Sequence, residues 1–110
     1  MSPQNIIDSE QMLQEIVKRI RDTVKPLRIV LFGSRARGAS RETSDFDVLV
    51  INDSQEERFH RAAPLYRLLA DLPVEVDIMV YTPSEVEEWS EVKEAFVTTA
   101  LREGKVLYEG

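Results

Sequence analysis

The sequence predicts a mixed α+β fold, in which a small mixed β-sheet is flanked by helices. Two observations predict it. Short runs of branched apolar residues alternate with segments of helical periodicity, and most of the runs are bounded by proline, glycine or asparagine. Because helices lie between the strands, we expect them to cover at least one face of the sheet. The chain has 110 residues and shows no linker or repeat, which predicts a single domain over residues 1–110.

The first half of the chain predicts one helix and two strands. Apolar residues recur at helical spacing over residues 9–24, and Pro26 ends that pattern. Residues 27–32 form a short apolar run that ends at Gly33, and residues 46–51 read FDVLVI. We interpret both runs as buried strands.

The middle of the chain predicts helix and then strand. Residues 55–71 show a helical pattern interrupted by Pro64, which predicts a kink or two short helices. Its predicted inward residues are Phe59, Ala62, Tyr66, Leu69 and Ala70. Residues 74–81 alternate as a strand does. One face receives Val74, Val76, Ile78 and Val80, and the other receives Glu75, Asp77, Met79 and Tyr81.

The last third predicts two helices and an edge strand. Thr82 begins a capping-box pattern that Glu85 completes, so a helix should run to about Trp89. A second helix is expected over residues 91–102, capped by Gly104. Its predicted inward residues are Val92, Ala95, Phe96 and Thr99. Residues 105–108 then form a short edge strand.

Composition excludes several classes of function. A net charge of -6 argues against an extended electrostatic surface for binding DNA or RNA. The absence of cysteine excludes disulfides and thiolate metal sites and fits a reducing cytoplasm. No signal-peptide pattern is present, and no apolar stretch approaches the ~20 residues of a membrane span. We therefore expect a cytoplasmic protein without a membrane partner or an extended nucleic-acid partner.

The loop after the first strand gathers groups that bind phosphate. Gly33 lets the backbone approach a ligand closely, and a helical turn starting at Ser34 would add N–H groups and a hydroxyl. Arg35 and Arg37 could hold phosphate oxygens. The same residues also suit an ordinary turn with solvated arginines, and the lysine of a Walker loop is absent. A positive loop in an acidic chain favours a local anion, such as a triphosphate, over a long polyanion.

Three aspartates are candidate metal ligands. Asp45 and Asp47 would share one face at the start of a strand, with Cα atoms ~6.5–7 Å apart. Carboxylates so placed suit Mg²⁺, although they could also be solvated turn residues. Asp77 lies between apolar strand residues, where a charge is disfavoured. If its strand lies beside residues 46–51, all three acids could hold two metals ~3.5–4 Å apart. If that face is solvated, Asp77 is a surface acid like Glu75.

The combination of Gly33-Ser34, Asp45-x-Asp47 and Asp77 resembles the DNA polymerase beta nucleotidyltransferase superfamily. The length makes the chain similar to the minimal nucleotidyltransferases, antitoxin partners of HEPN-domain toxins in prokaryotes. The resemblance covers nearly the whole chain and implies the polymerase beta-like fold. It implies that Gly33 and Ser34 bind the triphosphate of ATP. It also implies that Asp45 and Asp47 ligate two Mg²⁺ ions, and that Asp77 ligates one and helps to activate the attacking hydroxyl.

The resemblance further implies a reaction of the EC 2.7.7 type, in which a hydroxyl attacks the α-phosphorus of ATP and pyrophosphate leaves. The acceptor would be a hydroxyl, typically of tyrosine, on a HEPN RNase toxin that AMP addition silences. Two alternatives remain open: an idle antitoxin that neutralises its toxin by contact, and a nucleotidyltransferase acting on a small molecule. Larger relatives add a helical acceptor domain that this sequence lacks. We therefore expect a partner or a second subunit, within an oligomeric toxin complex, to complete the site.

Overall fold

The computed structural model describes residues 9–33, 46–92 and 95–110. In these residues four strands form one sheet, in the order β3-β2-β1-β4. β1 pairs antiparallel with both β2 and β4, whereas β2 and β3 run parallel. The strands are β1 (Arg28–Phe32), β2 (Phe46–Ile51), β3 (Val76–Tyr81) and β4 (Lys105–Glu109). The predicted mixed sheet is confirmed, and β3 and β4 form its two edges.

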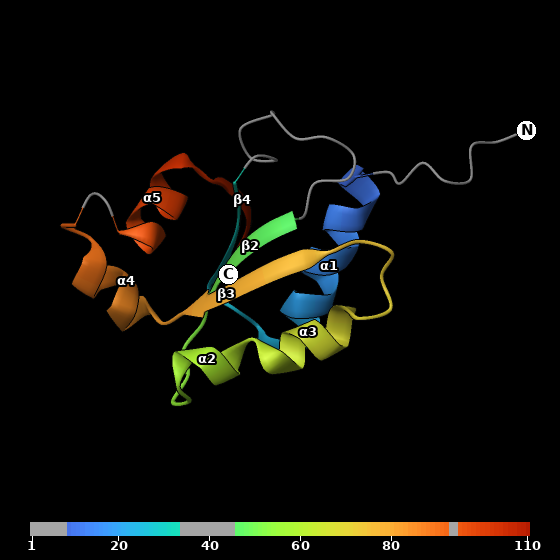
Figure 1. Ribbon diagram of the computed structural model, residues 1–110, viewed down its shortest axis with the longest axis horizontal. Coiled ribbons are helices and arrows are strands. Elements are labelled where there is room, and N and C mark those ends of the chain that lie inside the picture. The colour runs from blue at the N-terminus through green and yellow to red at the C-terminus, as the bar shows by residue number, and fades with distance from the viewer. Residues whose placement is uncertain (1–8, 34–45, 93–94) are drawn as a thin grey trace, which may run out of the picture.

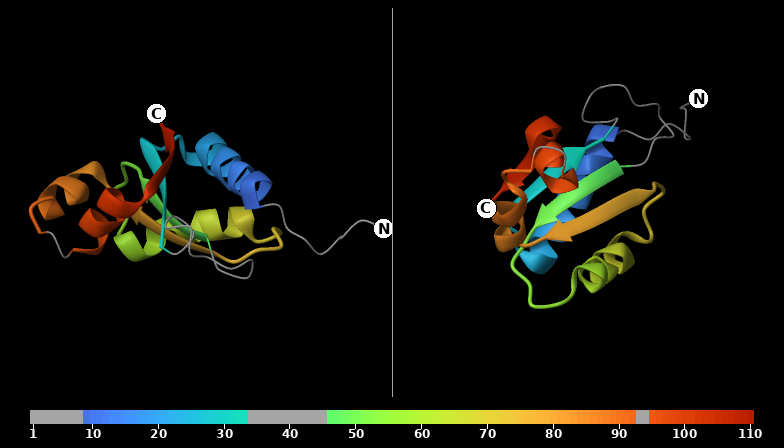
Figure 2. Two further views of the ribbon diagram at one scale, coloured as in Figure 1. Left: turned by 90° about the horizontal axis from the view of Figure 1, so that it is seen from above. Right: turned by 60° about the vertical axis from the view of Figure 1, so that its left-hand side comes forward.

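Helices cover both faces of this sheet. They are α1 (Ser9–Val24), α2 (Arg58–Arg61), α3 (Ala63–Leu69), α4 (Pro83–Trp89) and α5 (Phe96–Glu103). α1 and α3 pack on one face, whereas α4 and α5 lie together beside the end where β3 finishes (Figure 1, Figure 2). In the described part of the chain, no helix combines the length and the apolar character that crossing a membrane requires.

The larger apolar cluster lies between the sheet and the pair α1 and α3. Its buried members come from α1, α3 and the strands β1, β2 and β3: Ile16, Ile20, Ile29, Leu31, Phe46, Val48, Val50, Leu65, Leu69, Ile78 and Val80. Each such side chain contributes about 1.5–3 kcal/mol when it is fully buried. This face is therefore the main source of the hydrophobic stability.

The smaller apolar cluster lies on the opposite face of the same strands. Its buried members are Val30, Leu49, Ile51, Tyr81, Val97 and Ala100. They come from the middle of β1, the second half of β2, the end of β3 and one side of α5. This cluster consequently covers only one end of the face, and the starts of β2 and β3 lie beyond it.

Local sequence signals set the ends of α1 and α4. After α1, Lys25 adopts a positive φ of 50° and its N–H donates to the Arg21 carbonyl at 3.1 Å, and Pro26 follows. At the start of α4, the N–H of Glu85 donates to the Thr82 hydroxyl, and the Glu85 carboxylate accepts from the Thr82 N–H. The predicted capping box is confirmed.

Helices α2 and α3 confirm the predicted break near Pro64 and correct part of the predicted inward face. Leu69 is buried as predicted, but its buried partner is Leu65, whereas Tyr66 is 43% exposed and Ala70 is also exposed. Leu65 and Leu69, at positions i and i+4, form an apolar stripe on a different side of the helix from Tyr66. That stripe packs into the larger cluster and turns Tyr66 toward the edge of the sheet.

Helix α5 begins five residues later than predicted, at Phe96, and its inward face also differs. Val97 and Ala100 are buried, whereas Phe96 is 44% exposed. Two apolar stripes one residue apart run along this helix, one with Phe96 and the other with Val97 and Ala100. The second stripe is the one that packs against the sheet. Gly104 does follow α5, but in an extended conformation. Position 104 requires glycine because a Cβ there would collide with Val30 and with the carbonyl of Leu31.

Two side chains close the outer edge of β3. Edge strands present unpaired N–H and C=O groups to solvent. The Ile78 N–H donates to the Tyr66 hydroxyl at 2.8 Å, and Arg61 Nη1 donates to the Val80 carbonyl at 3.2 Å. Arg61 also forms a bidentate pair with Glu85, with nitrogen to oxygen distances of 2.6 and 3.2 Å. These contacts tie α2, α3 and α4 to the strand that carries Asp77.

Candidate active site

Two of the predicted metal ligands lie side by side on the sheet. Asp47 of β2 and Asp77 of β3 are Cα partners in the parallel ladder. Paired residues of neighbouring strands project their side chains from the same face, and the two strands lie about 4.7–4.9 Å apart. The conditional prediction that the strand carrying Asp77 lies beside residues 46–51 is therefore confirmed. The two carboxylates form one row of the sheet, at the starts of both strands.

Gly33 completes this row from the β1 side. Phe32, the last residue of β1, is the Cα partner of Asp47, and Gly33 follows it. Gly33 has a φ of 77°, which residues other than glycine rarely adopt. A Cβ at this position would collide with the Oδ2 atom of the Asp47 carboxylate. The backbone at the start of the predicted phosphate loop is thus packed directly against a predicted metal ligand.

The exposure of the two aspartates decides a question that the sequence left open. Asp77 could be a disfavoured charge in the middle of a buried strand or a surface acid like Glu75. It is the second residue of β3 and is exposed, which agrees with the second alternative, while Asp47 is half-buried. Their sequence neighbours Val48 and Ile78 point to the opposite face, where both are buried. A charged side chain at an exposed position needs no partner, so the exposure of Asp77 does not by itself indicate a function. The evidence for a site is the pairing of Asp77 with Asp47.

The remaining predicted site residues lie outside the described residues. These are Ser34, Arg35, Arg37 and Asp45. Among the residues that the structure describes, no cluster of three acid, histidine or cysteine side chains could hold a metal. Asp47 and Asp77 supply carboxylate oxygens, the donor type that Mg²⁺ prefers, and Mg²⁺ commonly uses only one or two of them. The described pair therefore fits a magnesium site, and it is one acid short of the predicted set.

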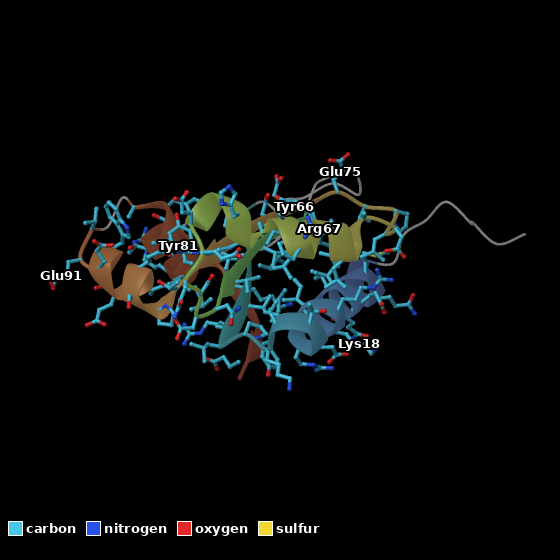
Figure 3. The ribbon with its side chains drawn as sticks, turned by 90° about the horizontal axis from the view of Figure 1, so that it is seen from below. Lys18, Tyr66, Arg67, Glu75, Tyr81 and Glu91 are labelled. Atoms are coloured by element: carbon cyan, nitrogen blue, oxygen red, sulfur yellow. The ribbon has the colours of Figure 1, made fainter. Side chains whose placement is uncertain are left out.

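Aromatic residues form a group next to the carboxylate row that the sequence motifs did not predict. Phe32 and Phe96 form an edge-to-face pair with ring centroids 5.1 Å apart. Phe96 also lies 6.3 Å from Tyr81, with their ring planes inclined by 27°. The motif pattern gave no hint of this group, because its members come from β1, β3 and α5. Figure 3 shows Tyr81 toward the α4 end of the molecule and Glu75 toward the other end.

Comparison with known families identifies the domain. The family model described as "Nucleotidyltransferase domain" matches residues 13–101, which is most of the chain. The chain belongs to this nucleotidyltransferase family. The match spans β1, β2 and β3, and so includes Gly33, Asp47 and Asp77. The predicted membership of the nucleotidyltransferases, and with it the predicted enzyme class, is confirmed.

Individual relatives agree with the family. A Methanocaldococcus jannaschii protein, provisionally named a protein adenylyltransferase, is 27% identical over 106 residues, which is 93% of this chain and all of the relative. A crystal structure of a Sulfolobus solfataricus protein, provisionally named a nucleotidyltransferase, superposes with a TM-score of 0.64. It is 24% identical and covers 91% of this chain and 82% of its own.

Two further crystal structures share the fold of this nucleotidyltransferase domain. One is a toxin-antitoxin with AMP-PNP, with a TM-score of 0.62 and 24% identity over 89% of this chain and 73% of the other. The second is the toxin-antitoxin MntA-HepT, with a TM-score of 0.57 and 21% identity over 92% of this chain and 73% of the other. The predicted fold is thereby confirmed.

Proposed function

We propose that this nucleotidyltransferase domain transfers AMP from ATP to a tyrosine hydroxyl of a partner HEPN-type RNase toxin and acts as its antitoxin. The observation that carries the proposal is the row formed by Gly33, Asp47 and Asp77 in a chain of this family. Two comparisons support the finer assignment. One relative is provisionally named a protein adenylyltransferase, and structures of the same fold are toxin-antitoxin complexes, one of them with AMP-PNP.

Each predicted site residue has a role in this proposal. Asp47 and Asp77, together with Asp45, would hold two Mg²⁺ ions, which neutralise charge on the phosphates when bound. The backbone of Gly33 and Ser34 would bind the triphosphate, and Arg35 and Arg37 would balance its charge. Gly33 suits this role because its backbone already lies against the Asp47 carboxylate.

The proposed reaction forms one bond and breaks one. The acceptor oxygen bonds to the α-phosphorus, and the bond from that phosphorus to the oxygen bridging to the β-phosphate breaks, so that pyrophosphate leaves. The hydroxyl proton passes to Asp77, whose exposed position lets it release the proton to water. With Mg²⁺ bound, Asp47 and Asp77 would hold the acceptor and the phosphate close together, which would lower the entropic part of the barrier.

Labelled nucleotide tests this proposal. The protein is incubated with α-labelled ATP, Mg²⁺ and its cognate toxin, and transfer of label to the toxin is measured. We expect wild type to label a toxin tyrosine and Asp47→Asn to lose the activity. Glu75→Gln is the matched control, because Glu75 is an exposed acid two residues before Asp77. Equal labelling by wild type and Asp47→Asn would refute the proposal.

The acidic surface favours one alternative, in which contact alone neutralises the toxin. A net charge of -6 suits docking on a basic RNase. A growth assay with the toxin distinguishes the two mechanisms. If transfer of AMP is the mechanism, Asp47→Asn fails to protect cells although it still binds the toxin. If contact is sufficient, the variant protects as well as wild type does.

A further inference from the structure

A small aromatic pocket lies beside the end of β3, on the same face of the sheet as the carboxylates. Its volume is about 240 Å³, and it is lined by Tyr81, Trp89, Ala95, Phe96 and Val97. Two of its rings are open to solvent, since Trp89 is 41% exposed and Phe96 is 44% exposed. None of the lining side chains carries a charge. The pocket therefore offers flat apolar surfaces that are accessible from outside.

The pocket is connected to the carboxylate row through ring contacts. Phe96 contacts Tyr81 on one side and Phe32 on the other, at 6.3 and 5.1 Å between centroids. Phe32 is the Cα partner of Asp47. An unbroken line of aromatic side chains thus leads from the predicted metal ligand to the pocket.

The strand geometry sets the distance between the carboxylate row and the aromatic pocket. Tyr81 follows Asp77 by four residues on β3, so both side chains project from the same face. At about 3.3 Å per residue, their Cα atoms lie roughly 13 Å apart. An extended nucleotide whose α-phosphate lies beside Asp77 spans a similar distance to the far side of its base. The spacing therefore matches a ligand with an anionic end and a flat apolar end.

We propose that this pocket binds the base of the nucleotide whose triphosphate lies at Asp47 and Asp77. The inference rests on the proposed function and adds the place and the chemistry of base recognition. Base and aromatic ring attract each other by stacking, which tolerates different bases because each has a π-face. Since the lining carries no charged group, it discriminates bases mainly by stacking area. We therefore expect purine nucleotides to bind more tightly than pyrimidine nucleotides, with little distinction between ATP and GTP.

The tryptophan makes this inference measurable, because Trp89 is the one tryptophan of the chain. The full-length protein is titrated with the magnesium complexes of ATP, GTP, CTP and inorganic tripolyphosphate. Trp89 fluorescence and calorimetry are recorded in parallel. We expect ATP and GTP to change the fluorescence. Tripolyphosphate should bind in the calorimeter without changing it, since it has no base.

Substitution of Phe96 separates base binding from phosphate binding. Phe96→Ala should weaken ATP binding roughly tenfold or more, because one stacking surface is lost, and leave tripolyphosphate binding unchanged. Because Phe96 is half-exposed at the first position of α5, the variant should fold, which circular dichroism verifies. Val106→Ala is the matched control, since Val106 is exposed to a similar extent but lies on β4. Trp89→Leu provides a second variant that should behave as Phe96→Ala does.

Each other outcome overturns the inference in a distinguishable way. If Phe96→Ala and Trp89→Leu bind ATP as wild type does and still transfer AMP, the base lies elsewhere and the proposed function stands. If they bind the nucleotides normally but no longer bind the toxin, the pocket belongs to the protein interface. If they weaken ATP and tripolyphosphate equally, the pocket affects the site only through the fold. If wild type binds neither ligand, the proposed function fails as well.

Discussion

The two faces of the sheet differ in how far helices cover them. On one face, the side chains of β1, β2 and β3 are apolar along their whole length, and α1 and α3 bury them. On the other face, α5 covers the apolar residues toward the end of β3 and reaches Phe32 of β1, whereas Asp77 at the start of β3 is exposed. The first row there contains Phe32, Asp47 and Asp77. The comparison indicates that one face provides stability and that the uncovered end of the other is available for chemistry.

Two neighbouring residues of β3 provide the strongest test of this division. Asp77→Asn should lower AMP transfer roughly 10²–10⁴-fold, because the proton acceptor is lost. Its free energy of unfolding should change by no more than about 0.5 kcal/mol, since Asp77 is exposed. Ile78→Ala should do the opposite and cost about 2–5 kcal/mol of stability, because Ile78 is 3% exposed. Denaturant unfolding and label transfer per folded molecule measure the two quantities.

The division would be wrong if Ile78→Ala lost transfer activity while it remained folded. It would also be wrong if Asp77→Asn were as unstable as Ile78→Ala. Glu75→Gln should change neither quantity and shows that loss of charge at this end of the strand has no effect by itself.

A pair of glycines provides the second test. Gly33→Ala should cost about 1–3 kcal/mol of stability because of the positive φ, and it should also reduce AMP transfer. The added methyl group collides with the Asp47 carboxylate, so a predicted metal ligand must move. Gly104→Ala also introduces a collision, with Val30 and the Leu31 carbonyl, but not with the Asp47 carboxylate. It should therefore lower stability and leave transfer per folded molecule unchanged. Similar losses of transfer in both variants would contradict a specific role for Gly33.

Tyr66 provides a smaller test at the edge of β3. Its hydroxyl binds the Ile78 N–H, which belongs to the peptide bond that follows Asp77. Tyr66→Phe should cost about 0.5–1.5 kcal/mol, the usual value of one hydrogen bond, and should lower transfer only severalfold. Tyr108→Phe, on the opposite edge strand, is the control for loss of a tyrosine hydroxyl. A Tyr66→Phe variant with wild-type stability would show that the edge contact contributes nothing.

The fold was predictable wherever one periodicity dominated the sequence. Residues 46–51 and 83–89 are bounded by clear signals, and their predicted bounds agree with β2 and α4. The region of α5 offered two helical stripes, and only contact with β1 could select between them. The predicted inward position of Phe96 was wrong for this reason.

The sequence could predict that Asp47 and Asp77 share one face if their strands are neighbours, but it could not predict the environment of that face. Alternation placed Asp77 and Met79 on one face, and the register of β3 against β2 brought Asp77 beside Asp47. Burial depends on how far a helix extends across the face, which strand periodicity does not encode. Of the two alternatives for Asp77, the surface acid is therefore confirmed, because α5 stops short of it. The aromatic pocket was missed because its residues come from β3, from α4 and from the start of α5.

The smallest expected effect belongs to an ion pair on the covered face. Arg19 of α1 binds both oxygens of Asp71, at 2.6 and 3.3 Å, just beyond the end of α3. Hydrogen bonding to Arg19 lowers the pKa of Asp71 below its ordinary value. A carboxylate with a lowered folded-state pKa stabilises the protein above its unfolded pKa of about 3.9 and loses that contribution as the pH falls through the folded value.

Asp71→Asn should therefore flatten the pH dependence of stability below about pH 4. The effect should be small, because the Asp71 side chain is 72% exposed and solvent screens the pair. Thermal unfolding of wild type and Asp71→Asn between neutral and acid pH measures it, with Asp53→Asn as an exposed control. AMP transfer at neutral pH should not change, since the pair joins two helices of the face that carries no carboxylate row. A change in transfer would show that α1 and α3 influence the site, and the two faces would then have to be treated as coupled.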